Sequence, residues 1–188
     1  MWIWLLVILG SVILDQATKW IVVRFIPYQE SVSFIDGVFE FTYIRNEGAA
    51  FGMLSDNRWV FMIVSTVAIA ALLIYLWKFR PESKWACAAV AMIIGGGIGN
   101  MIDRVRLGYV IDFLNFCAFP NLWMWIFNVA DAFVCVGGGI LFVWCLVSIV
   151  QEGKAAKEKK SAKASSAQIE ENVENNENNE NIENIENK

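Results

Sequence analysis

Two aspartates, Asp112 and Asp131, have the residue type and the surroundings for chemistry, because both lie in apolar sequence. Asp112 lies in Val-Ile-Asp-Phe, and Asp131 follows Phe-Asn-Val-Ala. An acid at the centre of a bilayer costs roughly 3 kcal/mol on insertion scales, so such acids are candidates for function. The chain has no histidine, which excludes Ser-His and Cys-His nucleophile pairs, HExxH zinc sites and histidine bases. We therefore expect carboxylates to perform any reaction.

The composition is that of a membrane protein. Of the 188 residues, 57% are hydrophobic and 18% are charged, whereas about a quarter of a soluble chain is charged. The net charge of -4 arises mostly in the C-terminal tail, and no basic face for nucleic acid is evident. No pair of cysteines has CxxC spacing, so we interpret them as small hydrophobic residues: Cys87, Cys117, Cys135 and Cys145.

Four apolar runs have the length of about 20 residues that a transmembrane helix needs. The first lacks a basic n-region and a cleavage site, so we interpret it as a retained helix that ends at Pro27. The expected fold is an all-α polytopic membrane protein with a transmembrane domain over 1–152. From 153 to 188 the Glu/Asn-rich composition predicts a disordered polar tail. The predicted spans are 2–26, 59–79, 85–102 and 123–150.

Two shorter segments join these spans. Asp36-Gly37, flanked by β-branched and aromatic residues, predicts a β-hairpin from Ser31 to Arg45. We expect this hairpin to form a small extracytoplasmic sheet on the membrane surface. Arg104–Leu122 is too short and too polar for another span, and we expect an interfacial loop or a short amphipathic helix there.

Basic residues near the span ends predict the orientation. Lys78, Arg80 and Lys84 lie between the second and third spans, and a run of lysines follows the fourth. This bias predicts that both termini are cytoplasmic and that the polar motifs face the outer side. The arginines expected on that outer side are Arg24, Arg45, Arg58, Arg104 and Arg106.

Three of the spans bear a short polar stripe near the same outer end. Residues three or four apart are neighbours on one helix surface, so the stripes on neighbouring helices are expected to meet. The stripes are Asp15, Thr18 and Lys19; Asn100, Asp103 and Arg104; and Asn128 with Asp131.

Each stripe also has an interpretation without chemistry. Asp15 and Lys19 form an i, i+4 pair that neutralises two costly charges, and Asp103 with its neighbouring arginines is typical of an interfacial charge cluster. Asp112 is placed to cap a short helix, and Asp131 to satisfy Asn100 or an arginine. Spacing alone leaves these alternatives open.

The chemical interpretation of the two aspartates is definite. Two carboxylates held close together in a low dielectric cannot both ionise, so they share a proton and titrate as a dyad. The ionised carboxylate takes a proton from a water molecule while the water oxygen attacks a peptide carbonyl. The protonated carboxyl donates its proton to the oxyanion or to the leaving amine. This is the chemistry of an aspartic protease.

Five blocks, in order, resemble the lipoprotein signal peptidases, the type II signal peptidases of bacteria. Together they extend from the first span to the fourth. The blocks are Asp15-Gln-Ala-Thr-Lys19, Asn46-Glu-Gly-Ala-Ala-Phe-Gly52, Gly96-Gly-Ile-Gly-Asn100-Met-Ile-Asp103-Arg104, Val110-Ile-Asp112-Phe113 and Phe127-Asn128-Val-Ala-Asp131.

The resemblance implies an aspartic endopeptidase of the bacterial cytoplasmic (inner) membrane, with four spans and an extracytoplasmic β-rich cradle. It cleaves prolipoproteins just before a cysteine that already carries a diacylglyceryl group, and it needs no metal or organic cofactor. The family's catalytic aspartates fall on Asp112 and Asp131. Its supporting residues, which position substrate, fall on Asp15, Lys19, Asn46, Asn100, Arg104 and Asn128. We expect membrane lipids as partners, no nucleic acid, and a monomer.

Three aromatic residues, Phe51, Trp123 and Trp125, are expected either to line a lipid-facing groove or simply to anchor the protein at the interface. The rival functions are a small proton-coupled transporter, in which the acids form a relay, and a non-enzymatic scaffold. The acids cluster towards one face and no inverted repeat of broken helices is evident, which disfavours a transporter.

Overall fold

The structure is a computed structural model that describes residues 2–48, 58–118 and 125–186. It divides into two compact units, Met1–Phe142 and Val143–Lys188, and the sheet and candidate site lie in the first. The helices are α1 (Trp2–Phe25), α2 (Arg58–Ile74) with its π-helical continuation η2 (Tyr75–Phe79), α3 (Lys84–Arg106) and α4 (Val129–Glu186). The strands are β1 (Ser31–Ile35), β2 (Phe39–Asn46), β3 (Val110–Phe116) and β4 (Ile126–Phe127).

The prediction of four spans is confirmed. Within the described residues, four helices are long and apolar enough to cross a membrane: Trp2–Phe25, Met62–Phe79, Lys84–Arg106 and Val129–Lys159. The third extends beyond its predicted end at 102 and includes Arg104. The fourth begins at Val129 rather than at 123, because Ile126 and Phe127 form a strand.

Helix α3 is the central helix of the first unit, and it packs against both α1 and α2. A Cβ at Gly96 would overlap the backbone carbonyl of Ala130 in α4, and one at Gly137 would lie 2.7 Å from the Ala89 carbonyl oxygen. Small residues of this kind let helix backbones approach closely in a membrane. The close approach of α4 to α3 places the first turn of α4 beside the polar stripe of α3.

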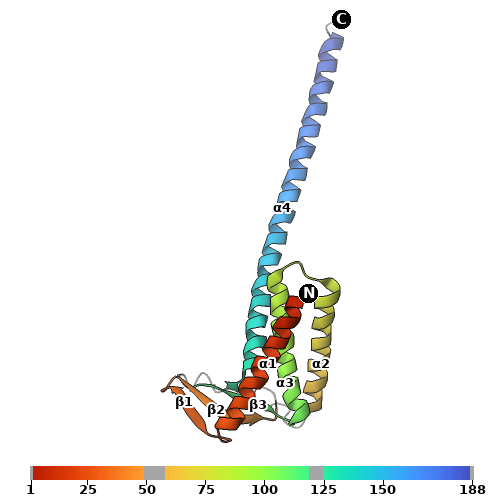
Figure 1. Ribbon diagram of the computed structural model, residues 1–188. Coiled ribbons are helices and arrows are strands. Elements are labelled where there is room, and N and C mark those ends of the chain that lie inside the picture. Colours follow the sequence, from red (N-terminus) through yellow and green to blue (C-terminus); the bar gives the residue numbers. More distant parts are fainter. Residues whose placement is uncertain (1, 49–57, 119–124, 187–188) are drawn as a thin grey trace. The chain divides into compact units, whose positions relative to one another are not determined.

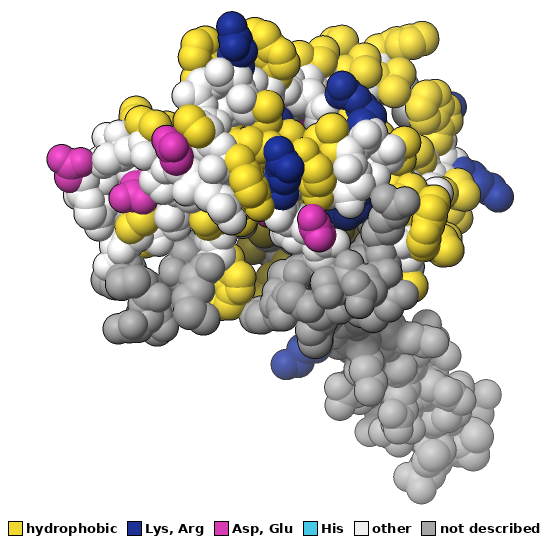
Figure 2. All heavy atoms as spheres, turned by 90° about the horizontal axis from the view of Figure 1, so that it is seen from below, with side chains coloured by type: hydrophobic (Ala, Val, Ile, Leu, Met, Phe, Trp, Pro, Cys, Tyr) yellow, Lys and Arg dark blue, Asp and Glu magenta, His cyan; other side chains and the backbone are white. Residues whose placement is uncertain are grey.

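The four strands form one antiparallel sheet in the order β1-β2-β3-β4. The predicted hairpin is confirmed: Val38 N–H donates to the Ile35 carbonyl at 2.9 Å, and Gly37 has φ +71°, which glycine adopts without strain. The sheet lies at the end of the helices where α1 ends and α2 begins (Figure 1). Seen from this end, basic, acidic and hydrophobic side chains are intermixed (Figure 2).

The expectation for the segment after α3 is wrong. We expected a loop or a short amphipathic helix over Arg104–Leu122, and its middle part is β3. The strand forms because its alternate residues Ile111 and Phe113 are apolar and are buried on one face. They pack there with Val22 of α1 and Tyr43 of β2. Asp112 lies between Ile111 and Phe113, and successive side chains of a strand point to opposite faces.

The last helix extends into the segment that follows the fourth predicted span. The backbone of α4 continues as helix to Glu186, where the composition predicts disorder. Ala, Glu and Lys are good helix formers and are frequent between 153 and 188, so they give this polar segment a local preference for helix without a core to pack on. The two compact units meet at 142/143, inside the span that the sequence predicts over 123–150.

Candidate active site

The polar residues predicted from five separate segments come together at the sheet end of the helices. Helix α1 contributes Asp15 and Lys19, and α3 contributes Asn100 and Asp103. The chain contributes Asn128 and Asp131 where α4 begins. Strands β2 and β3 add Asn46 and Asp112, and side-chain hydrogen bonds and ion pairs join all of these residues into one network.

One half of the network surrounds Lys19, whose side chain is almost completely buried. Its Nζ lies 2.9 Å from Oδ2 of Asp15 and 2.9 Å from Oδ2 of Asp103. It also donates to Oδ1 of Asn100 at 3.0 Å. A buried ammonium is tolerated only when it is paired and hydrogen-bonded, and here all three of its donors have an acceptor.

The two carboxylates around Lys19 also hold the backbone next to the proposed catalytic residues. Asp15 accepts the N–H of Ala130 at 3.0 Å, and Asp103 accepts the N–H of Ile111 at 3.1 Å. Ala130 directly precedes Asp131, and Ile111 directly precedes Asp112. The ion-paired acids therefore fix the start of α4 and the start of β3 relative to α1 and α3.

Gln16 belongs to this network, although we did not predict it as a site residue. Its Nε2 donates to Oδ1 of Asp103 at 2.9 Å and to the carbonyl of Gly99 at 3.2 Å. Asp103 was likewise assigned to a stripe but not to the supporting set. The i, i+3 spacing of Asp103 from Asn100 indicates that Asp103 belongs to the site. For Gln16, the one indication in the sequence is that it directly follows Asp15.

Asp112 is buried, with 1% of its surface exposed, and amides bind both of its oxygens. Asn46 Nδ2 donates to Oδ2 at 2.9 Å, and Asn128 Nδ2 donates to Oδ1 at 2.6 Å. Burial raises the pKa of Asp112 from its ordinary value of 3.8 to about 6, and the negative charge of Asp131 adds to the increase. The hydrogen bonds from the two asparagines and the charge of Lys19 act in the opposite direction.

Asp131 is half-buried in the first turn of α4 and is held by three contacts. Asn100 Nδ2 donates to its Oδ1 at 2.7 Å, and the backbone N–H of Asn128 donates to its Oδ2 at 3.3 Å. In return, the N–H of Asp131 donates to Oδ1 of Asn128 at 2.9 Å. This reciprocal pattern resembles a capping box. The bond from Asn100 is the contact that the structural alternative for Asp131 predicts, so that alternative explains part of its position.

A cap does not explain Asn128 completely. This fully buried residue hydrogen-bonds Asp131 through its backbone N–H and its side-chain oxygen, and it donates its side-chain amide to Asp112. One asparagine therefore contacts both acids. Within the described residues, no Lys or Arg nitrogen lies within 4.0 Å of either carboxylate, so both acids are held by neutral donors.

Some predicted residues do not bond the acid pair. Arg104 is half-buried and donates to the Asn100 carbonyl at 3.4 Å. Its charge acts on Asp131 and Asp112, but among the described residues it forms no ion pair within 4.0 Å with either acid. Thr18 donates to backbone carbonyls of its own helix. Phe51 and Trp123 lie outside the described residues, as does the second half of the block that begins at Asn46.

Comparison with known proteins identifies the family. Residues 7–147 match the family described as signal peptidase (SPase) II. The chain belongs to the signal peptidase II family. It is 43% identical to a lipoprotein signal peptidase of Halalkalibacterium halodurans over 157 residues, which cover 84% of this chain and 98% of that protein. A Geobacter sulfurreducens protein of the same name is 45% identical over 141 residues, which cover 73% of this chain and 87% of the relative.

A solved structure described as a bacterial membrane enzyme has the same fold as this signal peptidase II family member. The TM-score is 0.74 at 30% identity, and the match covers 79% of this chain and 90% of the other. Membership of this family makes the chain a peptide-bond hydrolase. Together with the four apolar helices, it also makes the chain a multi-pass bacterial membrane protein.

Proposed function

We propose that this chain removes signal peptides from diacylglyceryl-modified bacterial prolipoproteins, cutting just before the lipidated cysteine, with Asp112 and Asp131 as an aspartic catalytic pair. The observation that supports this most is the single buried Asn128 that hydrogen-bonds both carboxylates, neither of which forms an ion pair with a Lys or Arg of the described residues. The relatives named lipoprotein signal peptidase support the substrate.

The chemistry follows from the surroundings of the pair. One ionised carboxylate takes a proton from water as the water oxygen attacks the scissile carbonyl. The other, protonated carboxyl donates its proton to the developing oxyanion and then to the leaving amine. Because burial holds the pKa of Asp112 at about 6, this carboxyl gains and loses a proton near neutral pH, as an acid–base catalyst must.

The supporting residues have positioning roles in this proposal. Lys19 and Asp15, with Asp103 and Gln16, fix the backbone beside the acids, while Asn100 and Asn128 connect that network to the pair. Asn46 orients Asp112 from the hairpin. Arg104 adds a positive charge near the scissile bond and so favours binding of the oxyanion.

We also propose the arrangement in the membrane. Both termini are cytoplasmic, the sheet and the acids face the outer side, and residues 1–152 act as the peptidase domain while 153–188 are a cytoplasmic tail. The protein acts as a monomer among membrane lipids. The bias of Lys and Arg near the span ends supports this orientation. Reporter fusions at Lys84 and Gln151 test it, since a periplasmic signal from either site would contradict it.

The comparisons do not support the rival function of a proton-coupled transporter. The acids lie together at one end of the helices, whereas a relay needs ionisable groups along the path across the bilayer. A proton flux measurement in proteoliposomes separates the two functions. We expect no flux above that of empty vesicles, and a flux abolished by Asp131→Asn would favour the transporter.

The decisive experiment is cleavage by the purified protein in detergent. The substrates are one diacylglyceryl-modified prolipoprotein and the same precursor without the lipid. We expect cleavage of the first only, with a loss of roughly a thousandfold or more for Asp112→Asn and Asp131→Asn, in the range that acid–base catalysis contributes. Asp36→Asn, an exposed change in the hairpin turn, is the matched control and should keep full activity. Cleavage at the wild-type rate by either folded site variant would overturn the proposed pair.

A further inference from the structure

Arg45, the residue before Asn46 in β2, lies among the rings of three tyrosines. Its guanidinium carbon is 4.5 Å from the ring centroid of Tyr28, 5.0 Å from that of Tyr109 and 5.9 Å from that of Tyr43. Its Nε also donates to the hydroxyl of Tyr43 at 3.3 Å. A cation over an aromatic face is attracted by the charge distribution of the ring, so these contacts hold the four side chains together. We name them the arginine–tyrosine cluster.

The arginine–tyrosine cluster joins three segments of the chain. Tyr28 lies in the connection from α1 to β1, Tyr43 lies in β2, and Tyr109 directly precedes β3. The backbone of Tyr43 is bonded to the first of these segments as well. Its carbonyl accepts the N–H of Gln29 at 2.9 Å, and its N–H donates to the Glu30 carbonyl at 3.2 Å. The cluster therefore fixes the end of β2 relative to the start of β3 and to the chain that follows α1.

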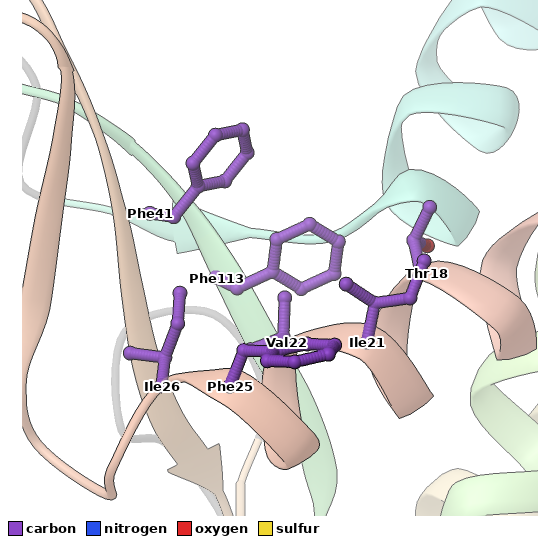
Figure 3. Close-up of a pocket in the computed structure, with 7 residues that line it drawn as sticks. All are labelled: Thr18, Ile21, Val22, Phe25, Ile26, Phe41 and Phe113. Atoms are coloured by element: carbon purple, nitrogen blue, oxygen red, sulfur yellow. The ribbon is translucent and has the colours of Figure 1, made fainter.

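The cluster lies on the face of the sheet opposite to the acids. Arg45 pairs with Ile111 of β3, and directly opposed residues of an antiparallel pair share a face. Phe113 is on the same face as Ile111, and Figure 3 shows Phe113 beside the side chains of α1. Asn46 and Asp112 are the next residues along the two strands, so their side chains point to the other face. Arg45 thus contacts neither acid, and its connection to them runs through its neighbour Asn46.

Asn46 needs support because it is the last residue of β2. Its partner Val110 is the first residue of β3, so the ladder between the two strands ends at this pair. The Nδ2 of Asn46 nevertheless lies 2.9 Å from Oδ2 of Asp112. Arg45 precedes Asn46, and Tyr109 precedes Val110. The cation–π contact between Arg45 and Tyr109 therefore crosses the last pair of the ladder diagonally and holds it closed.

We propose that Arg45 is a positioning residue for Asp112, because the arginine–tyrosine cluster fixes the last pair of β2 and β3 and so aims the Asn46 amide at the Asp112 carboxyl. This inference rests on the proposed function, in which Asp112 belongs to the catalytic pair. Among the described residues, Arg45 forms no ion pair with an Asp or Glu. Its aromatic contacts and its bond to Tyr43 are thus the interactions that its loss removes.

The first test measures the pKa of Asp112 and needs no substrate. NMR of the labelled aspartate carboxyl carbons in detergent follows the titration, and the signal that is missing from Asp112→Asn assigns the residue. The hydrogen bond from Asn46 lowers this pKa. We therefore expect Arg45→Met to raise it, in the same direction as Asn46→Ala but by less. Arg45→Lys, which keeps a cation for the rings, should lie closer to wild type.

The second test measures cleavage of the diacylglyceryl-modified prolipoprotein. Arg45→Met should lower kcat roughly threefold to fivefold, the equivalent of one exposed cation–π contact, and should leave KM unchanged. The double variant Arg45→Met with Asn46→Ala should be no slower than Asn46→Ala alone, because changes at residues that act through one another are not additive. Melting temperatures check that each variant is folded.

Arg24→Met is the matched control. Arg24 is an exposed arginine in the last turn of α1 and is also predicted on the outer side, so its removal takes away the same charge from the same surface. It should leave the pKa of Asp112, kcat and KM at their wild-type values. An equal loss in Arg24→Met and Arg45→Met would show that Arg45 is only a surface charge, and it would overturn the inference.

The outcomes separate this inference from the proposed function. If the pKa of Asp112 rises in Arg45→Met but wild type cleaves no lipidated substrate, the proposed function fails while the positioning of Asp112 stands. If wild type cleaves its substrate but the pKa is the same in Arg45→Met, the proposed function stands and the inference is wrong. Additive losses in the double variant would also overturn it, since Arg45 would then act independently of Asn46.

Discussion

Four aspartates lie within one hydrogen-bond network, and they fall into two pairs with opposite surroundings. Asp15 and Asp103 share the Lys19 ammonium at 2.9 Å each. Asp112 and Asp131 are instead held by the amides of Asn100, Asn128 and, for Asp112, Asn46. The residue type is the same, and only the partner differs.

The difference indicates which pair is suited to chemistry. Asp15 and Asp103 share one ammonium and also accept the N–H groups of Ala130 and Ile111, so the pair around Lys19 is suited to holding the backbone. Asp112 has no such partner, and burial raises its pKa to about 6, so both of its protonation states are within reach near neutral pH. The lysine-paired acids therefore have a positioning role in our account, and the amide-held acids have the catalytic one.

Removing the cation should have the largest effect. Lys19→Met leaves Asp15 and Asp103 buried without a partner charge, which should destabilise the protein by about 3–5 kcal/mol. Cleavage should fall together with the folded fraction. Thermal unfolding in detergent measures the loss, and Lys84→Met, at the exposed start of α3, is the control. An unchanged melting temperature for Lys19→Met would show that the ion pairs do not hold the site.

Crowding the lysine-paired carboxylate should have the next largest effect. A Cβ at Gly99 would lie 2.5 Å from Oδ2 of Asp15, so Gly99→Ala must displace that carboxylate or separate α1 from α3. Overpacking of this kind costs about 1–3 kcal/mol. Gly138→Ala is the matched control, since its Cβ would meet nothing within 4 Å. Equal melting temperatures for the two variants would contradict the close approach at Gly99.

Loosening one of the amide-held acids should have a smaller and different effect. In the wild-type protein the hydrogen bond from Asn46 to Oδ2 of Asp112 lowers the pKa of that carboxyl. Asn46→Ala removes this bond. The pKa should therefore rise further, and kcat should fall roughly tenfold, at the low end of what a hydrogen bond to a charged group contributes. The pH profile of kcat measures the shift. Asn115→Ala, which loses a bond to Thr42 elsewhere in the sheet, should not move the profile.

The pH dependence of stability should show the smallest effect. The pKa of Asp112 is about 6 in the folded protein against an ordinary 3.8, so between these values the carboxyl is protonated in the folded state only. Its contribution to stability is complete below about pH 4 and is lost as the pH rises through 6. Asp112→Asn should remove this part of the slope in melting temperature between pH 4 and 7. Identical slopes for the two proteins would contradict the raised pKa.

The sequence predicted the features that depend on local spacing. The four spans follow from runs of apolar residues, and the meeting of the stripes follows from i, i+3 and i, i+4 offsets on neighbouring helices. The Asp36-Gly37 turn is equally local. For these features, the pattern and the structure agree to within a few residues at most boundaries.

The features that the sequence did not predict depend on contacts between distant segments. Residues 110–116 form a strand because they pair with β2, more than sixty positions earlier in the chain, and because Phe113 packs on α1. Asp103 reaches the backbone of Ile111, and Asp15 reaches that of Ala130, only once that strand and α4 are in place. Spacing within one segment contains no information on such pairings.

The most direct test of our account measures cleavage rate and melting temperature on the same preparations of four variants: Asp15→Asn, Asp103→Asn, Asp112→Asn and Asp131→Asn. We predict that the changes at 112 and 131 abolish cleavage of the lipidated substrate while the melting temperature stays close to wild type. The changes at 15 and 103 should lower the melting temperature first, with cleavage retained by the fraction that stays folded. Wild-type cleavage by the 112 or 131 variant, or full stability with no cleavage in the 15 and 103 variants, would contradict the division into a catalytic and a positioning pair.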